Sequence, residues 1–238
     1  MATEPGDPIE TLVAAVRRTL AANAEPAKAG PMQAYMRSAM PYRGVPTPVL
    51  RRALGPVFAA HPLPDRSAWE RAVRALFWAA EYREERYAAV DLTGHRQYRT
   101  WLDLQAVPLL EAMIAEGAWW DYVDELAIRR VGPILRANHD EMTPLLHAWA
   151  RDEHLWKRRA AIICQVGSKG GTDRALLTDA IDENVADPDF FIRKGIGWAL
   201  REYAKTEPDW VRTFVYERRD RLSPLSQREA RKHLTDAR

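Results

Sequence analysis

The amino-acid sequence predicts an all-α protein built from stacked pairs of antiparallel helices. Three observations support this fold class. Apolar residues recur at helical spacing along nearly the whole chain, and no stretch shows the bounded apolar–polar alternation of a half-buried strand. In addition, short motifs recur at a step of about 35 residues, as they do in repeat proteins.

Capping residues and prolines mark several helix starts. Thr47 precedes Pro48, Asp65 follows Pro64, and Ser223 precedes Pro224. Between such signals the connections are short, so we expect a single domain over residues 1–238, of which residues 1–30 are the least informative. The periodicity predicts helices at residues 8–21, 31–39, 48–60, 66–79, 82–93, 104–116, 119–136, 141–150, 154–166, 173–185, 189–204, 208–218 and 224–235.

The internal repetition is weak but regular. The segment WKRRA (156–160) aligns with FIRKG (191–195), 35 residues later, and RYA (86–88) precedes the matching RRA (158–160) by 72 residues, close to two such steps. Each copy places a basic residue before a small one on the second helix of a pair. This layout is typical of HEAT-like repeats, which form a superhelical array with one helix of each pair on a concave face.

Composition excludes several classes of protein. The 238 residues carry a net charge of only +2, and no window approaches the ~18 apolar residues that a membrane span needs. The acidic N-terminus lacks the pattern of a signal peptide, so we expect a cytoplasmic protein. The single cysteine, Cys164, excludes an intrachain disulfide and multi-cysteine metal sites, and its apolar neighbours predict a buried core residue.

The arrangement of charge is more informative than its sum, because basic residues come in doublets. A nearly neutral protein can still carry one basic face that matches a charged polymer, although ordinary solvated helix faces would give the same pattern. The doublets are Arg17-Arg18, Arg51-Arg52, Arg129-Arg130, Lys157-Arg158-Arg159, Arg193-Lys194 and Arg218-Arg219.

Trp198 stands apart from the core face of its helix. At about 100° per residue, Trp198 points away from the apolar stripe and lies among Lys194, Arg201 and Lys205. It either packs against an adjacent repeat or forms an aromatic surface on a basic face. The stripe itself comprises Ile192, Ile196, Ala199, Leu200 and Tyr203.

Asp124 lies at the margin of an apolar stripe in the helix that starts near Trp119, one turn after Trp120. A carboxylate there is costly unless it is paired or functional, so the alternatives are a structural Asp–Arg pair and a catalytic group.

Arg159 falls among Ile162 and Ile163 on its own helix. It either extends to solvent or stands at a cleft edge, facing a phosphate or a carboxylate.

The segments around these residues resemble the AlkD-like DNA alkylation-repair family. The resemblance covers roughly residues 30–236 in order, and the segments that carry it are YMRSAMPYRGVPTPVLRR (35–52), WWDYVDELA (119–127), HLWKRRAAI (154–162), FFIRKGIGWALREYAKTEPD (190–209) and PLSQREARKHL (224–234). The family consists of HEAT-like-repeat DNA glycosylases that act on cationic alkylated purines. It implies a concave DNA-binding face for this chain.

Carried over by position, the family's catalytic aspartate falls on Asp124 and its active-site tryptophans fall on Trp120 and Trp198. Its phosphate-contacting arginine falls on Arg159. The aromatic residue beside the lesion falls on Tyr35, with DNA-backbone contacts at Thr47 and Arg51, and Lys194 and Arg201 are further expected DNA contacts. The chain departs from the family at Pro46, where a polar residue able to contact the DNA backbone is expected.

The resemblance implies a monofunctional glycosylase that removes 3-methyladenine- and 7-methylguanine-type bases from double-stranded DNA as the first step of base excision repair. An ionised Asp124 would stabilise the developing sugar cation and orient water, and the tryptophans would offer π-faces to positive charge. We expect no metal, no cofactor, no obligatory protein partner and a monomer. The alternative is a non-catalytic helical-repeat module that binds DNA or serves as a protein scaffold.

Overall fold

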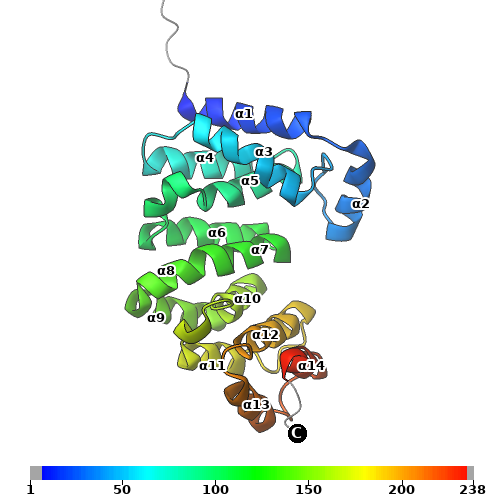
Figure 1. Ribbon diagram of the computed structural model, residues 1–238, viewed down its shortest axis with the longest axis vertical. Coiled ribbons are helices and arrows are strands. Elements are labelled where there is room, and N and C mark those ends of the chain that lie inside the picture. Colours follow the sequence, from blue (N-terminus) through cyan, green and yellow to red (C-terminus); the bar gives the residue numbers. More distant parts are fainter. Residues whose placement is uncertain (1–6, 235–238) are drawn as a thin grey trace, which may run out of the picture. The chain divides into compact units, whose positions relative to one another are not determined.

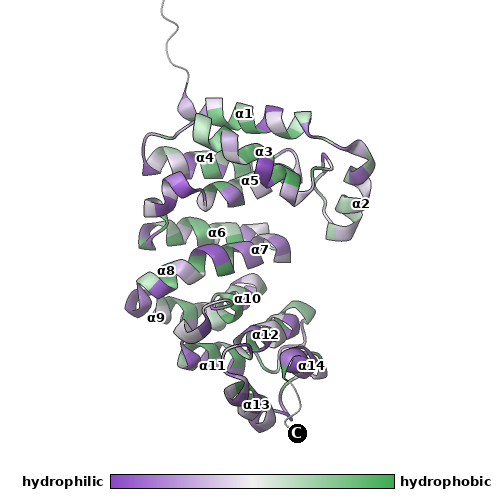
Figure 2. Ribbon diagram, in the orientation of Figure 1, coloured by the Kyte–Doolittle hydropathy of each residue, from purple (hydrophilic) through white to green (hydrophobic). Residues whose placement is uncertain are grey.

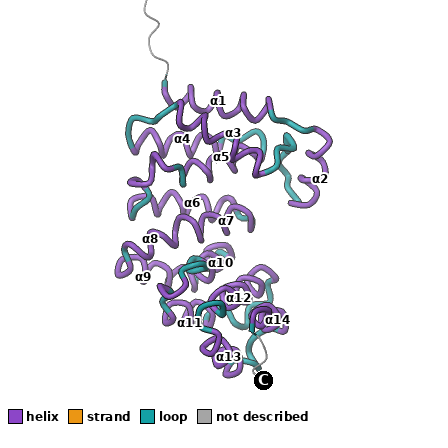
Figure 3. Tube along the Cα trace, in the orientation of Figure 1, coloured by secondary structure: helices purple, strands orange, loops and turns teal. Residues whose placement is uncertain are grey.

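A computed structural model describes residues 7–234, and within that range every regular element is helical and no strand occurs (Figure 3). The predicted all-α class is therefore confirmed. The α-helices are α1 (Pro8–Ala22), α2 (Pro26–Met36), α3 (Thr47–Ala60), α4 (Arg66–Trp78), α5 (Arg83–Thr93), α6 (Val107–Gly117), α7 (Trp120–Leu126), α8 (Gly132–Ala137), α9 (His139–Ala150), α10 (Leu155–Ile163), α11 (Arg174–Asp182), α12 (Phe190–Tyr203), α13 (Pro208–Glu217) and α14 (Pro224–Ala230).

The chain forms two compact units, residues 1–105 and 106–238, and each has its own core. In the first unit, α1, α3, α4 and α5 pack on one another (Figure 1). α2 has only one buried residue, Met36, and it leads through an irregular segment into α3. The expectation of one domain over the whole chain stays a prediction.

The second unit is built from successive helix packings. α6 packs on α7, α10 packs on both of them and on α9, and α9 also contacts α8 and α11. The chain then continues through α12, which lies against α10 on one side and against α14 on another. α7, α10, α12 and α14 therefore form a continuous series of neighbours, and this series positions the candidate site.

The predicted core stripes are confirmed. All five apolar stripe residues of α12 are buried, as are Val123, Leu126, Ala127, Val131 and Ile134 in the region of α7 and α8. Cys164 is fully buried, as expected, and burial raises the pKa of its thiol to about 12. Figure 2 shows hydrophobic and hydrophilic residues alternating along most helices, as amphipathic packing requires. Among the helices that the structure describes, none is long and apolar enough to cross a membrane.

Three predicted helices differ most from the structure. The helix expected at 224–235 ends at Ala230 and is followed by the 3-10 turn Arg231–His233, and residue 235 lies outside the described residues. The helix expected at 31–39 begins at Pro26 and ends at Met36, followed by Arg37 in a left-handed conformation with φ 48°. The single helix expected at 119–136 is divided by a π-helical segment, Ala127–Val131. That segment ends where Gly132 meets another backbone: a Cβ on Gly132 would lie 2.3 Å from the carbonyl oxygen of Cys164.

Candidate functional site

Asp124 lies near the C-terminal end of the short helix α7, and its position is fixed by the core. Its neighbours Val123 and Leu126 are buried, which turns the Asp124 side chain toward the rim of the apolar face. That side chain is 16% exposed, so most of it is withdrawn from solvent. Trp119 precedes α7 in extended conformation, and Trp120 is the first residue of the helix.

Arg159 of α10 binds the Asp124 carboxylate through two parallel hydrogen bonds. Its Nε donates to Oδ1 and its Nη2 donates to Oδ2, each at 2.8 Å. The remaining terminal nitrogen, Nη1, donates to the carbonyl oxygen of Phe191 at 2.5 Å. Because the Arg159 side chain is only 6% exposed, its guanidinium is occupied by the protein. Of the two partners that the sequence left open for Arg159, the structure shows the carboxylate.

Opposing influences act on the acidity of Asp124. Burial raises the pKa of this carboxyl above its usual range, because removing a carboxylate from water disfavours its charged form. The hydrogen bonds and positive charge of Arg159 oppose that shift, and the neighbouring Asp121 adds to it. Asp124 is thus a poorly hydrated carboxylate whose orientation and charge depend on one arginine.

Trp120 is a partly exposed residue of α7, the helix that carries Asp124. Trp198 is a partly exposed residue of α12, the helix whose Phe191 carbonyl oxygen binds Arg159. Trp120 lies one turn before Asp124 on α7, which places the two side chains on the same side of that helix. On α12, Trp198 follows Gly195 by three residues and Phe191 by seven, so these three share a face. That face lies against Arg159, because a Cβ on Gly195 would be 3.2 Å from the Arg159 Nη1.

An aromatic cluster that the sequence did not single out packs around the start of α7 and α12. The ring of Trp119 lies 5.5 Å from that of Phe191 and 6.0 Å from that of Trp156, and Trp156 and Phe191 are 5.0 Å apart. The cluster fixes the main chain at Phe191, whose carbonyl oxygen binds Arg159. Phe191 acts on the site through its backbone carbonyl, which binds Arg159, and through the packing of its ring. Helical periodicity reveals neither of these contacts.

Lys194 and Arg201, expected as DNA contacts, both bind Glu229 of α14. The Lys194 Nζ lies 2.8 Å from one Glu229 oxygen and the Arg201 Nη1 lies 2.7 Å from the other, while Lys232 also donates to Glu229 at 2.8 Å. Burial alone would raise the pKa of Glu229, but the hydrogen bonds from Lys194 and Lys232 overcome it and lower the pKa to about 2. This carboxylate was not identified from the sequence.

In the first unit, the expected DNA contacts lie on exposed positions. Tyr35 on α2 is 76% exposed, and Thr47 is the exposed first residue of α3. Arg51 follows one turn later, with half of its side chain exposed and its Nε donating to Asp91 at 3.2 Å. Pro46, the departure from the expected pattern, occupies the N-cap of α3 and makes no side-chain capping bond.

The basic doublets are largely neutralised within their own units. Each doublet contributes at least one cation to an ion pair, which reduces the positive charge available to a partner. The pairs are Arg17–Glu85, Arg51–Asp91, Arg130–Glu125, Lys157–Glu111, Arg158–Asp187, Arg159–Asp124, Lys194–Glu229, Arg218–Asp182 and Arg219–Asp220.

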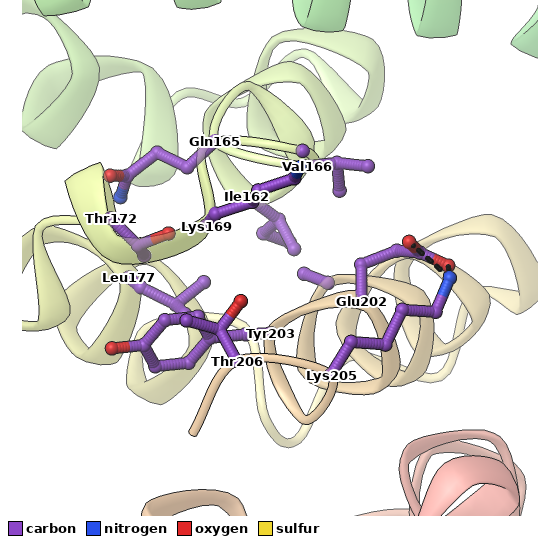
Figure 4. A pocket seen from close by; sticks show the side chains of 12 residues that line it. Ile162, Gln165, Val166, Lys169, Thr172, Leu177, Glu202, Tyr203, Lys205 and Thr206 are labelled. Atoms are coloured by element: carbon purple, nitrogen blue, oxygen red, sulfur yellow. Dashed lines mark hydrogen bonds and ion pairs between the residues drawn. The ribbon is translucent and has the colours of Figure 1, made fainter. Parts of the chain in front are cut away.

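A separate pocket of about 290 Å³ lies between α10, α11 and α12 (Figure 4). Its floor includes Ile162 and Leu177, and Glu202 and Lys205 form an ion pair at its edge. The Gln165 side chain exchanges hydrogen bonds with the backbone of Asp173, so its polar atoms are already satisfied. The pocket lining includes neither Asp124 nor either tryptophan of the candidate site.

Comparisons with known proteins agree with this arrangement. The sequence profile of the family described as "DNA alkylation repair enzyme" matches residues 16–234. A solved structure from Enterococcus faecalis, described as a predicted DNA alkylation repair enzyme, superposes with a TM-score of 0.78 at 33% sequence identity, covering 90% of this chain and 98% of that one. A search of curated protein sequences finds no match. The chain belongs to the DNA alkylation repair enzyme family.

Proposed function

We propose that this protein is a monofunctional DNA glycosylase that hydrolyses the N-glycosidic bond of cationic alkylated purines in double-stranded DNA. The observation that carries the proposal is the mostly buried Asp124 carboxylate held by Arg159, with Trp120 one turn away on α7 and Trp198 on α12. Family membership supports a role in DNA repair. The chemistry below follows from what these side chains can do.

The proposed reaction breaks a bond whose leaving group is already activated. Alkylation at N3 or N7 gives the purine a positive charge, so it departs as a neutral base without needing a proton. Positive charge then develops on the deoxyribose, and a fixed, poorly hydrated carboxylate stabilises such a charge far better than water does. Asp124 would supply that negative charge and accept a proton from the attacking water.

Arg159 acts in this proposal as a positioning residue for Asp124 and not as a direct phosphate contact. The two parallel hydrogen bonds fix the plane of the carboxylate, and each carboxylate oxygen accepts only one of them. Each oxygen therefore keeps a lone pair for water or for the sugar. Burial raises the pKa of Asp124, whereas the positive charge of Arg159 lowers it. Arg159 therefore favours the ionised form of the carboxyl.

Trp120 and Trp198 would bind the positively charged nucleotide through their π-faces. A cation–π contact contributes roughly 0.5–2 kcal/mol, depending on desolvation, and it favours the charged lesion over a neutral base. The chemistry requires neither a metal nor a redox cofactor. In residues 7–234 no group of three or more histidine, cysteine or carboxylate side chains is arranged to hold a metal ion.

Base release from methylated duplex DNA tests the proposal. The protein is incubated with duplexes that carry 7-methylguanine, 3-methyladenine or, as a neutral comparison, hypoxanthine, and the released bases are identified by mass spectrometry. We expect release of the two cationic bases and none of hypoxanthine. Equal release of all three would contradict the charge-based mechanism. DNA binding without release of any base would favour a non-catalytic DNA-binding module, and absence of both would favour a protein scaffold.

A further inference from the structure

α14 and the short 3-10 turn after it, Arg231–His233, carry a basic face that the candidate site does not use. Pro224, Gln227, Arg228 and Arg231 follow the i, i+3, i+4, i+7 spacing of one helical face, and together with Lys232 they line a shallow open hollow. Figure 2 shows α14 as predominantly hydrophilic. We call these five residues the C-terminal basic face.

The opposite side of α14 is fixed to α12. Ser226, Glu229 and Ala230 are buried there, and the Ser226 hydroxyl donates to the carbonyl oxygen of Arg193 at 2.9 Å. Gly197 allows this close approach, because a Cβ at that position would lie 2.5 Å from the Cβ of Glu229. α14, which carries most of the C-terminal basic face, therefore packs closely against α12, the helix that carries Trp198.

The charge of this region is unbalanced. Glu229 is the only carboxylate in residues 224–234, and its charge is already matched by Lys194, Arg201 and Lys232. Arg228 and Arg231 are exposed, and neither forms an ion pair with any residue of the described range 7–234. Unlike the nine doublet residues that form ion pairs, these two guanidinium groups have no acidic partner there.

We propose that the C-terminal basic face binds backbone phosphates of duplex DNA next to the candidate active site. Guanidinium groups match phosphate oxygens with two parallel hydrogen bonds, and Arg228 and Arg231 lie one turn apart on one face. A membrane-binding face would combine its cations with large apolar side chains that insert into lipid, and the lining of this hollow contains none. The choice of DNA as the polyanion rests on the proposed function.

The test is the salt dependence of binding to an undamaged duplex, measured by fluorescence anisotropy with the full-length protein. Each phosphate contact contributes about 0.9 to the slope of log affinity against log salt. We expect Arg228→Gln/Arg231→Gln to weaken binding and to make the slope shallower by about 1.8. The charge-preserving variant Arg228→Lys/Arg231→Lys is expected to keep the wild-type slope.

Arg96→Gln/Arg99→Gln is the matched control. These arginines are exposed, have the same i, i+3 spacing and lie in the first unit, and their removal changes the net charge equally. A wild-type slope for the C-terminal double variant, or an equal loss in the control, would overturn the inference. The inference would also be overturned if the C-terminal double variant lost binding to anionic phospholipid vesicles but kept its binding to duplex DNA. Parallel assays of base release separate the two proposals: a wild-type protein that binds duplex through Arg228 and Arg231 but releases no base contradicts only the proposed function.

Discussion

At the scale of single residues, Asp124 has a structural role as the partner of Arg159 and, in the proposed function, a chemical role as well. Asp124→Asn removes the negative charge while keeping a similar shape, and we expect base release to fall by about 10²–10³-fold, the typical loss when one preorganised electrostatic group is removed. Arg159 then loses a charged partner, so we also expect a loss of about 2 kcal/mol in the free energy of unfolding. Single-turnover release of 7-methylguanine and urea denaturation measure the two effects.

A double variant separates these roles. Asp124→Asn/Arg159→Gln removes both charges, so it is expected to recover stability relative to Asp124→Asn while base release stays low, because an unpaired buried charge costs more than a neutral pair. Release at nearly the wild-type rate by Asp124→Asn would contradict the catalytic assignment, whatever the stability of the variant.

The acidity of Asp124 leads to a prediction about pH. Only the ionised carboxylate stabilises a sugar cation, so the rate of base release should fall as pH decreases through the pKa of Asp124. Because burial raises that pKa, we expect the loss of activity to occur above the usual range of an aspartate. The single-turnover rate is measured between about pH 4 and 8 with duplex affinity followed in parallel. A rate independent of pH over this range, with binding intact, would contradict the role of Asp124.

Trp198 offers a test of the charge-based mechanism. A cation–π contact of roughly 0.5–2 kcal/mol corresponds to a rate loss of about 2- to 30-fold for Trp198→Ala on a cationic lesion. Trp198→Phe keeps an aromatic face and is expected to retain part of the rate. Release of 7-methylguanine under single-turnover conditions measures both variants. Equal losses in the two variants would instead indicate that Trp198 acts through its size or its indole nitrogen.

At the scale of the helices, the packing of α12 on α14 depends on Gly197, because this residue has no side chain. In Gly197→Ala the new Cβ would lie 2.5 Å from the Glu229 Cβ and 3.0 Å from the Ser226 carbonyl oxygen, so α14 must move. We expect a loss of about 1–3 kcal/mol in the free energy of unfolding, the usual cost of overpacking. Urea denaturation provides the measurement.

Gly170→Ala is the control for this prediction. Gly170 lies in a surface turn where an added Cβ would meet nothing within 4 Å, so the substitution should leave stability nearly unchanged. Wild-type stability in Gly197→Ala would show that α14 adjusts its position freely on α12.

Helical periodicity predicted most elements because it follows from which residues each helix buries. It failed where the backbone is shaped by contacts distant in sequence. Pro31 resembles a helix start, yet it lies inside α2, which begins at Pro26. The π-helical segment at Ala127–Val131 precedes Gly132, which meets the backbone of Cys164, and no local pattern encodes that approach.

The sequence suggested the residues of the candidate site but not the residues that they bind. Asp124, Trp120, Trp198 and Arg159 were identified from their unusual positions on helices and from the family resemblance, whereas the ion pair between Asp124 and Arg159 required the fold. The repeat step offered one overlooked signal. Asp124 and Arg159 are 35 residues apart, and so are Lys194 and Glu229. Opposite charges one repeat apart lie on neighbouring helices, where they can pair.

At the scale of the whole molecule, the balance of charge governs how strongly salt weakens DNA binding. The doublets named in the sequence analysis contain thirteen basic residues, and if all of them contacted phosphate the slope of log affinity against log salt would be about −12. Most of them bind carboxylates instead, and within the described residues the doublet members outside those pairs are Arg18, Arg52, Arg129 and Arg193.

We therefore expect a slope between about −4 and −5, the range given by those four arginines alone or together with the two of the C-terminal basic face. Anisotropy titrations of an undamaged duplex between about 50 and 200 mM salt measure it. A slope near −12 would show that the ion pairs open when DNA binds and release their cations to the phosphates. A slope of zero would show that neither set of cations meets the DNA backbone, and it would favour the protein-scaffold alternative.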